Sequence, residues 1–350
     1  MLAKILKIVY FVPYGFILLV AFKIASWNVA GLRALVRKEP NALRELCQKH
    51  DLDMLCLQET KLQEMHLEDP KLKLKGMLDE AGYDEYWSCS TVKKGYSGTC
   101  VFVKRRGTGK TNSKGKQATM DSFFGSKKTG KATTKHKTSN SDKAIPVDSG
   151  MLTPTNVDFS VGEEIDNEGR VIVLDFPWST IANVYVPNSG QKLERLDYRT
   201  KEWDKFFLKF MQDKQKKRGL PVIWLGDLNI AHRAYDIWND GAKHLATQAG
   251  VTEQERESFT EQLEAGFVDV FRRLHPKAKG NYSYWSQRAG NREPNKGLRL
   301  DYFVASDDMF DEDSQAIPRD SYMIMDQMGS DHAPVVLEIE IKGSKNQERP

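Results

Sequence analysis

Residues 221–229 read PVIWLGDLN, an apolar run of strand length that ends in a polar turn containing glycine. Three other stretches follow the same plan, in which unusual polar residues close an apolar strand: KIASWN (23–28), DMLCLQE (53–59) and TIANVYVPN (180–188). Short apolar runs bounded by glycine or polar residues are typical of buried strands. The polar residues at their ends are therefore candidates for a common site at one rim of a sheet.

Helical spacing appears between these strands, at about residues 40–50, 194–212 and 252–264. The chain has 350 residues, 40% of them hydrophobic, which is enough for a sizeable core. Strands alternating with helices indicate an α/β fold. The four cysteines have no CxxC spacing, which favours a reduced protein with buried thiols over a zinc site.

Three further polar residues lie at the opposite ends of their strands. Asp301 opens the run DYFVA, and Asp331 and His332 precede the run APVVLEIEI. If these residues meet those that close the other strands, some strands must be antiparallel to their neighbours. The sequence therefore predicts a sheet that is mixed or largely antiparallel.

The acidic residues of this set suit a metal-dependent site. Glu59 and Asp331, with Asp227 nearby, offer hard oxygen ligands without cysteine, a combination that favours Mg²⁺, for which Mn²⁺ can substitute, over zinc. Taken singly, each acid has an ordinary explanation as a strand-end charge or a turn residue. Their joint placement at strand ends is what favours a function.

The remaining polar residues suit a phosphate. Asn28, Asn188 and Asn229 can donate hydrogen bonds without adding charge beside the acids. Pairing of His332 with Asp301 would fix the imidazole tautomer and favour its protonated form near neutral pH. Together these groups predict a site that cleaves phosphodiester bonds.

Nine sequence blocks carry a family resemblance. They are WNVAGLRA (27–34), LCLQETK (55–61), GYSG (95–98), EGRVIV (168–173), YVPNSG (185–190), RLDYR (195–199), GDLNIAH (226–232), LRLDYF (298–303) and GSDHAP (329–334). In this order they resemble the exonuclease III class of apurinic/apyrimidinic (AP) endonucleases, within the endonuclease/exonuclease/phosphatase superfamily. The resemblance implies a four-layer α/β sandwich of two mixed, largely antiparallel sheets flanked by helices. It also implies Mg²⁺-dependent hydrolysis of the phosphodiester bond 5′ to abasic sites in base excision repair, and leaves accompanying 3′ exonuclease or 3′ phosphodiesterase activity open.

The resemblance assigns the metal and the attacking water to five residues. Glu59 resembles the principal metal ligand, and Asp331 stands where the family has a further carboxylate at the metal. Asp227 resembles the acid that orients or deprotonates the water, and Asn229 would hold that water or the reacting phosphate. Asn28 matches the asparagine that bonds to Asp227, and we include it in both the catalytic and the metal set.

The resemblance also assigns the groups around the phosphate. His332, oriented by Asp301, would contact the phosphate and stabilise its developing charge. Tyr185 and Asn188 look like donors to the phosphate, and Tyr185 is a candidate for protonating the leaving 3′ oxygen. Whether the general base is His332 or Asp227 stays open at this point.

Recognition of the base-less sugar is implied at a small apolar pocket that contains Tyr284, Leu298 and Leu300. Gln191 and Arg288 match residues that the family inserts into the duplex. Leu298 stands where vertebrate-type enzymes have Trp, so we expect a looser pocket and lower selectivity. Gln191 stands where the family has an Arg, which should weaken the affinity for the product DNA.

Ala30 is the sharpest departure from the family pattern. Family members carry Asp or Asn at this position, near the metal. We therefore expect a weaker affinity for Mg²⁺ than in relatives.

The N-terminal segment, residues 1–22, contains an apolar run over residues 5–22. The run is at the lower limit for a membrane span, and lysines at its start resemble a signal sequence, but no small-residue cleavage site follows it. A presequence, a mispredicted start and a signal anchor all stay open. We place the catalytic domain at residues 23–342 and a polar tail at 343–350.

An insertion at residues 106–150, rich in Lys, Thr, Ser and Gly, has the composition of a disordered loop. Residues 104–143 contain 12 Lys or Arg and two acids, a local charge of +10, which leaves −6 for the rest of a chain whose net charge is +4.

Residues 117–124 resemble a PCNA-interacting peptide, so we expect the sliding clamp as a partner. The residues that carry its pattern are Gln117, Met120, Phe123 and Phe124. The basic clusters suit a nuclear import signal or a phosphate-attracting tail, with a solvated linker as the alternative.

These features predict a nuclear monomer that acts on double-stranded DNA with abasic sites, without a membrane partner. A mitochondrial share and membrane anchoring through residues 5–22 stay open. Two other functions are kept as alternatives: a superfamily phosphodiesterase acting on lipid phosphates, and a clamp-bound scaffold without catalysis. The blocks that resemble DNA-repair enzymes argue against the first, and the retained site residues argue against the second.

Overall fold

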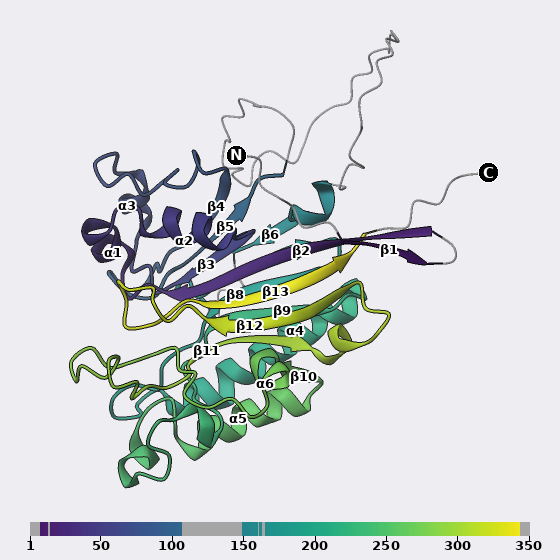
Figure 1. Cartoon of the computed structure of the whole chain (residues 1–350). Coiled ribbons are helices and arrows are strands. Elements are labelled where there is room, and N and C mark those ends of the chain that lie inside the picture. The colour runs from purple at the N-terminus through teal and green to yellow at the C-terminus, as the bar shows by residue number, and fades with distance from the viewer. Residues whose placement is uncertain (1–7, 13–14, 107–148, 160, 163–164, 344–350) are drawn as a thin grey trace.

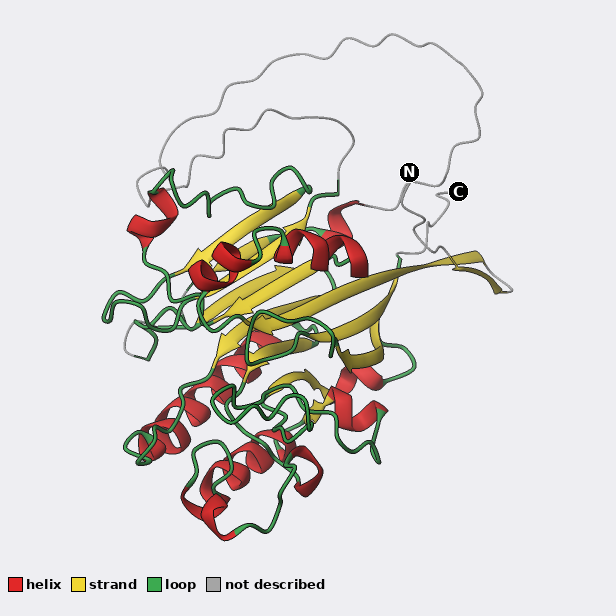
Figure 2. Cartoon of the chain, turned by 60° about the vertical axis from the view of Figure 1, so that its left-hand side comes forward, coloured by secondary structure: helices red, strands yellow, loops and turns green. Residues whose placement is uncertain are grey.

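The computed structural model of the chain describes residues 8–12, 15–106, 149–159, 161–162 and 165–343. Within these ranges the strands form two sheets, and helices lie on either side of the pair (Figure 1). A view turned by 60° shows the strands of the sheets between the helices (Figure 2).

The first sheet consists of β1 (Ile8–Val12), β2 (Gly15–Asn28), β3 (Met54–Gln58), β4 (Tyr83–Ser88), β5 (Thr99–Lys104), β12 (Ala316–Met323) and β13 (Val335–Lys342). Their order across the sheet is β12-β13-β2-β3-β5-β4, and β1 pairs with β2. The pair β2 and β3 is parallel, and the other neighbouring pairs are antiparallel. The sheet is therefore mixed and largely antiparallel.

The second sheet consists of β6 (Asn156–Asp158), β7 (Val171–Phe176), β8 (Ser179–Tyr185), β9 (Val222–Asp227), β10 (Phe267–Asp269) and β11 (Asp301–Ser306). Their order is β10-β11-β9-β8-β7-β6. Here β8 and β9 are parallel, and the other neighbours are antiparallel. Each sheet thus contains one parallel pair, as expected of the mixed sheets that the sequence predicts.

The helices are α1 (Leu32–Lys38), α2 (Ala42–His50), α3 (Glu64–Glu68), α4 (Asp204–Arg218), α5 (Glu253–Glu264) and α6 (Val270–Leu274). Short helical turns are η1 (Ser149–Leu152), η2 (Tyr198–Trp203), η3 (Ala234–Asp236), η4 (Lys243–Thr247) and η5 (Asp307–Phe310). The helix expected over residues 194–212 is a π-helical turn, η2, followed by α4 as far as Arg218.

The side chains of β2 point alternately into two different hydrophobic cores, which shows how the layers pack. Val20, Phe22 and Ile24 belong to the core between the two sheets, whereas Ala25 and Trp27 belong to the core beneath α1 and α2. Successive side chains of a strand point to opposite faces, so one strand serves two cores. A third core packs the second sheet against α4 and α5. The four-layer α/β sandwich is therefore confirmed.

The N-terminal part of the fold differs from the boundary drawn after residue 22. Strand β2 begins at Gly15: β1 pairs with it from Gly15 to Leu19, and β13 pairs with it from Leu19 to Ser26. Val20 and Phe22 are 2% and 1% exposed and belong to the central core. Part of the apolar run is thus a strand of the catalytic domain. No helix in the described part of the chain has the length and apolar character that crossing a membrane requires.

The described residues next to the insertion, 104–106, form ion pairs with acidic residues of the folded domain. Lys104 pairs with Asp51 at 2.6 Å, Arg105 pairs with Asp79 at 2.7 Å, and Arg106 pairs with Asp53. The basic cluster at 104–106 is therefore bound to acidic partners of the folded domain. The clamp-binding residues expected at 117–124 lie outside the described residues.

All four cysteines lie in the described chain as free thiols. Cys47, Cys56 and Cys100 are buried, and Cys89 is partly buried. The thiols are therefore components of the packed domain, as the sequence predicts.

We expect the Phe22→Ala variant to lose about 3–5 kcal/mol of unfolding free energy, because it removes a fully buried ring. The Phe22 ring lies 5.6 Å from that of Phe176 and 5.4 Å from that of Trp178, measured between centroids. Urea unfolding followed by tryptophan fluorescence measures the change. The matched control is Phe159→Ala, whose ring is 47% exposed and should cost far less. Equal small losses in both variants would show that residues before Lys23 are dispensable to the fold.

Candidate active site

The polar residues expected at a common rim meet at one end of the sandwich. Tyr185, Asp227 and Asp301 end or open the adjacent strands β8, β9 and β11, and Asp227 is the register partner of both others. Asn28 ends β2 in the first sheet. The site therefore joins the ends of both sheets.

Asn28 links carboxylates that belong to different sheets. Its Nδ2 donates to Asp227 Oδ2 at 2.8 Å and to Glu59 Oε1 at 3.1 Å, while its Oδ1 accepts from the backbone N–H of Ala30 at 2.9 Å. The amide nitrogen, not the oxygen, thus faces the acids. Its contact with Asp227 is the one that the resemblance implies, whereas its part as a metal ligand stays a prediction.

Glu59 lies just beyond β3 with a left-handed backbone (φ 51°). Its carboxylate accepts from the Tyr185 hydroxyl at 2.8 Å and pairs with Lys61 Nζ at 2.9 Å. Burial alone would raise the pKa of Glu59, but the charge of Lys61 and the hydrogen bonds from Lys61, Asn28 and Tyr185 outweigh burial and lower it. Glu59 is therefore ionised, and Lys61 is its counter-ion.

His332 lies between two buried acids. Its Nδ1 is 2.7 Å from Asp301 Oδ2, and its Nε2 is 3.9 Å from Asp227 Oδ2, an ion-pair distance too long for a hydrogen bond. Burial lowers the pKa of His332, but the charges of Asp301 and Asp227 outweigh burial and raise it to about 10. The imidazole is thus a cation at neutral pH.

The pKa of Asp227 is higher than that of an ordinary surface acid. Burial raises its pKa, the charge of His332 lowers it, and the charges of Asp301 and Glu59 raise it again, with a net upward shift. The backbone N–H of Asn229 donates to Asp227 Oδ1 at 2.9 Å. Asp227 is therefore a stronger base than an exposed carboxylate.

Asn229 and Asn188 form a pair next to Asp227. Asn188 Nδ2 donates to Asn229 Oδ1 at 2.8 Å, and Asn229 Nδ2 donates to the Val186 carbonyl at 2.9 Å. Arg199, which we did not single out from the sequence, is buried and donates to the Asn229 carbonyl at 2.7 Å. This guanidinium holds the left-handed turn after β9 in place.

A second arginine supports Tyr185. The Arg170 guanidinium lies 4.8 Å from the centre of the Tyr185 ring and donates to the Tyr185 carbonyl at 2.9 Å. It also donates to the hydroxyl of Tyr96 at 2.7 Å. The blocks EGRVIV and GYSG contain these residues, but spacing alone does not show that they meet. Their contacts fix the ring whose hydroxyl points at Glu59.

The acidic residues are suited to a divalent cation on their chemistry. Glu59 and Asp331 supply oxygen donors, and the Lys61 ammonium beside Glu59 shows that this position stabilises positive charge. Asp227, Asp301 and His332 also have ligand atoms within 4.8 Å of one another. We favour the Glu59 side, because the imidazolium of His332 would repel a metal ion and its Nδ1 is already bonded to Asp301.

The residues expected to hold the sugar lie next to this cluster. The Tyr284 ring centroid is 5.0 Å from that of His332, and Tyr284 packs on a small apolar cluster that includes Leu298 and Leu300. Gln191 and Arg288 are exposed, and in the described part of the chain neither is hydrogen-bonded to the cluster. Their role in duplex insertion stays a prediction.

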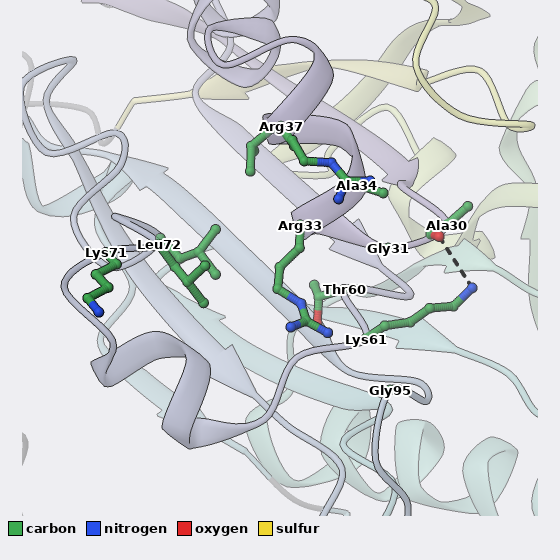
Figure 3. Close-up of a pocket in the computed structure, with 12 residues that line it drawn as sticks. Ala30, Gly31, Arg33, Ala34, Arg37, Thr60, Lys61, Lys71, Leu72 and Gly95 are labelled. Atoms are coloured by element: carbon green, nitrogen blue, oxygen red, sulfur yellow. Dashed lines mark hydrogen bonds between the residues drawn. The ribbon is translucent and has the colours of Figure 1, made fainter.

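A basic cavity of about 680 Å³ adjoins the site at Ala30 and Lys61. Arg33, Arg37 and Lys71 also line it. Figure 3 shows Arg33 reaching toward the loop that carries Thr60 and Lys61, and the Lys61 ammonium directed at the Ala30 carbonyl, 3.3 Å away. Sequence reasoning missed this cavity, since its cations come from loops and helices that are far apart in the chain.

Comparisons with known proteins show which sequences and folds this chain is similar to. The sequence profile described as the Endonuclease/Exonuclease/phosphatase family matches residues 25–332. The chain is 38% identical to an exodeoxyribonuclease of Bacillus subtilis, over 91% of this chain and 100% of that protein. It is 33% identical to a DNA-(apurinic or apyrimidinic site) endonuclease of Dictyostelium discoideum, over 91% of this chain and 71% of that protein. The crystal structure of an AP endonuclease from Leishmania major is similar with a TM-score of 0.68 at 30% identity, covering 95% of this chain and 90% of that chain.

We expect Asp301→Asn to bring the pKa of His332 down toward its ordinary value of about 6.5, because the variant removes the nearest negative charge. Imidazole resonances in NMR spectra of the metal-free protein report this pKa. His232 is an internal reference, since burial and then Arg233 lower its pKa to about 4.

In the parent protein, His332 should stay protonated from pH 6 to 8. Its raised pKa stabilises the fold fully below the unfolded value of about 6.5, and this contribution is lost as the pH rises through the folded value. A parent His332 that titrates near pH 6.5 would contradict the assignment.

Proposed function

The chain belongs to the endonuclease/exonuclease/phosphatase family and is a DNA-repair hydrolase, and on that premise we propose that it hydrolyses the phosphodiester bond on the 5′ side of abasic sites in DNA. The observation that carries the proposal is the cluster in which Asn28 joins Glu59 to Asp227, with His332 and Tyr185 beside them. This cluster combines a base, a cationic donor and a neutral donor around one point, as phosphodiester hydrolysis requires.

Asp227 is the general base in this proposal. His332 already carries its proton at neutral pH, so it has no free position to accept another, whereas Asp227 has a raised pKa and lies within the cluster. Asp227 would take a proton from the attacking water, whose oxygen bonds to phosphorus. The alternative base, His332, is disfavoured by its charge.

The other groups would stabilise the phosphate and the leaving oxygen. The His332 imidazolium donates to a non-bridging phosphate oxygen, and Asn229 and Asn188 hold the water or the phosphate. The P–O3′ bond breaks, and Tyr185, whose pKa burial raises further, keeps its hydroxyl proton to donate toward the 3′ oxygen. Mg²⁺ bound at Glu59 and Asp331, or Mn²⁺ in its place, would supply positive charge next to the phosphate oxygens.

The surfaces on either side of the catalytic cluster would contact the DNA substrate. Tyr284, Leu298 and Leu300 would hold the base-less sugar, with Gln191 and Arg288 entering the duplex. The basic cavity beside Ala30 suits the sugar-phosphate backbone, because cations that neutralise phosphates provide most of the non-specific affinity for DNA.

Several finer assignments are also proposals. We infer 3′ exonuclease or 3′ phosphodiesterase activity as a companion of endonuclease cleavage, since the same bond is broken. The sequence of the insertion supports binding to the sliding clamp through Gln117, Met120, Phe123 and Phe124, and residence in the nucleus. We also propose that the protein is a monomer. A lipid phosphodiesterase and a non-catalytic scaffold are the alternatives that the next experiment separates.

An oligonucleotide duplex with a tetrahydrofuran abasic analogue tests the proposal. We expect Mg²⁺-dependent incision that EDTA abolishes, and a loss of about 10²–10⁴-fold in kcat for Asp227→Asn, because the proton acceptor is removed. Denaturing gels measure the rate. Asp213→Asn is the matched control, since Asp213 is an exposed acid paired with Lys209 on α4.

Cleavage of a lipid phosphodiester instead of the duplex would support the lipid alternative, and no cleavage of either would support the scaffold. Incision by Asp227→Asn at the parent rate would contradict the mechanism.

We expect Ala30→Asp to bind Mg²⁺ more tightly, by at least several-fold. The new carboxylate would stand next to Lys61, which would be drawn away from Glu59, and Asp tolerates the left-handed backbone of residue 30 (φ 49°) better than Ala. Titration calorimetry and the paramagnetic signal of bound Mn²⁺ report the affinity without any reaction. Ala30→Asn separates charge from backbone tolerance, and an Ala30→Asp affinity equal to that of the parent would contradict the expectation.

A further inference from the structure

Arg292 lies in the loop that follows Trp285 and is not one of the site residues that the sequence predicts. Its guanidinium donates to three backbone carbonyls of one neighbouring loop, those of Gln327 at 2.7 Å, Met325 at 3.1 Å and Ser330 at 3.1 Å. In the described chain no backbone N–H is hydrogen-bonded to any of these three carbonyls. Arg292 is therefore the donor that satisfies them.

The loop of residues 325–330 has few restraints of its own in the described chain. Ser330 is the only one of its six residues that is buried, and Met325 and Met328 are 43% and 56% exposed. Its ion pair, between Asp326 and Lys49, joins two largely exposed side chains, and pairs of that kind contribute little. Hydrogen bonds from a charged donor are stronger, so the guanidinium is the main restraint on this loop.

Ser330 connects the loop to the catalytic cluster. Its hydroxyl donates to the Asn28 carbonyl at 2.7 Å and accepts from the backbone N–H of His332 at 3.2 Å. Asp331, the carboxylate proposed at the metal, lies between Ser330 and His332 in the chain. The hydrogen bond from Arg292 to the Ser330 carbonyl therefore restrains the residue from which both catalytic side chains follow.

Asp331 depends on this loop more than His332 does. His332 is also held by the Asp301 carboxylate at 2.7 Å and by the indole N–H of Trp27, which donates to the His332 carbonyl at 3.1 Å. In the described chain the Asp331 carboxylate has one hydrogen-bond partner, the hydroxyl of Ser330 at a long 3.4 Å. A shift of the loop would therefore displace the carboxylate before it displaces the imidazole.

Arg292 also belongs to the loop of residues 286–296, which is expected to contact DNA because it contains Arg288. Contacts with Trp285 restrain this loop: the guanidinium of Arg292 lies 4.9 Å from the centre of the indole ring, and the indole N–H donates to Asn295 Oδ1 at 3.1 Å. The side chain that holds the loop 325–330 is thus anchored at the base of the loop that would meet the duplex.

We propose that Arg292 is a positioning residue that connects the DNA-contacting loop 286–296 to Asp331 and His332. The inference rests on the proposed function, because it assigns what aligns that same site. Contact of Arg288 with the duplex would restrain one loop, and the three hydrogen bonds of Arg292 would pass that restraint to the other. Arg292 acts through backbone carbonyls and does not touch the reacting atoms.

An electrostatic role for Arg292 predicts the opposite effect on metal binding. Burial lowers the pKa of Arg292 and the charge of Asp331 raises it, so the two charges interact. A cation near a metal ligand repels the metal ion, so loss of the charge alone would tighten Mn²⁺ binding. Loss of alignment would weaken it, and the direction of the change separates the two roles.

The test uses the full chain and the tetrahydrofuran duplex. Arg292→Ala should lower kcat by roughly 10- to 100-fold with KM nearly unchanged, since loss of a group that orients a metal ligand has effects of this size. The affinity for Mn²⁺, measured from its paramagnetic signal without DNA, should fall as well. Arg292→Lys should recover only part of both, because an ammonium keeps the charge but lacks the planar fork that reaches several carbonyls.

Chemical rescue provides a readout that general destabilisation would not give. Guanidinium chloride, far below the concentrations that unfold the protein, should restore part of the kcat of Arg292→Ala and none in the parent. Equal concentrations of NaCl are the reference, because DNA binding depends on salt.

The matched control is Arg218→Ala. The Arg218 guanidinium is also partly buried and donates to the carbonyls of Phe176 at 2.6 Å and Ser179 at 2.9 Å, at the end of β8 opposite to Tyr185. Urea unfolding should show a loss of stability in both variants. Arg218→Ala should keep the parent kcat and the parent affinity for Mn²⁺.

A double-mutant cycle tests the connection between the loops. If Arg288 and Arg292 act along one path, the combined variant should lose less in kcat/KM than the product of the two single losses. Losses that multiply would overturn the connection.

The remaining outcomes separate the inference from the proposed function. A parent that incises the duplex while Arg292→Ala keeps its kcat overturns the inference alone, and so does tighter Mn²⁺ binding, absence of rescue, or an equal loss of kcat in Arg218→Ala. If Arg292→Ala does not fold, the same readouts on Arg292→Lys decide. A parent that does not cut contradicts the proposed function, and the Mn²⁺ affinities then still decide whether Arg292 aligns Asp331.

Discussion

The site depends on one neutral side chain, the Asn28 amide, which joins a carboxylate from each sheet. Its two N–H groups are directed at Glu59 and Asp227, and its oxygen is held by the backbone of Ala30. Buried acids so close together repel one another, and an amide donor reduces this repulsion without adding a charge that would compete with a phosphate. The pKa values of the two acids differ for other reasons: the charge of Lys61 lowers that of Glu59, whereas burial raises that of Asp227. One residue at the end of β2 therefore joins two acids whose surroundings give them different roles.

The cost of placing these groups is visible in the backbone. Ala30, Glu59 and Asn229 all have left-handed conformations with φ near 50°. Each such residue costs on the order of 1–3 kcal/mol and persists only where its surroundings fix it. Here the fixing contacts are the Asn28 oxygen on the N–H of Ala30 and the Arg199 guanidinium on the carbonyl of Asn229. The hydrogen bonds that organise the chemistry also hold the strained turns.

Much of the fold and the site could be predicted from the sequence, because strand ends are marked by polar residues in apolar surroundings. Asp227, Asp301 and His332 were predicted as one group, and the strand polarity that brings them together followed from whether each opens or closes its strand. The supporting cations could not be predicted. Arg170 and Arg199 act through contacts with residues 15 and 30 positions away, which no local pattern reveals. The start of β2 was also missed, since an apolar run looks the same in a strand, a signal sequence and an anchor until its partner β13 is known.

The buried cysteines have a consequence for the chemistry that the protein can withstand. Burial raises the pKa of Cys47 to about 12 and that of Cys89 to about 11, and it raises the pKa of Cys56 and Cys100 well above the ordinary value. Peroxides and disulfides react with the thiolate, which is scarce at neutral pH when the pKa is this high. The four thiols are therefore poor targets for oxidation or disulfide exchange at neutral pH.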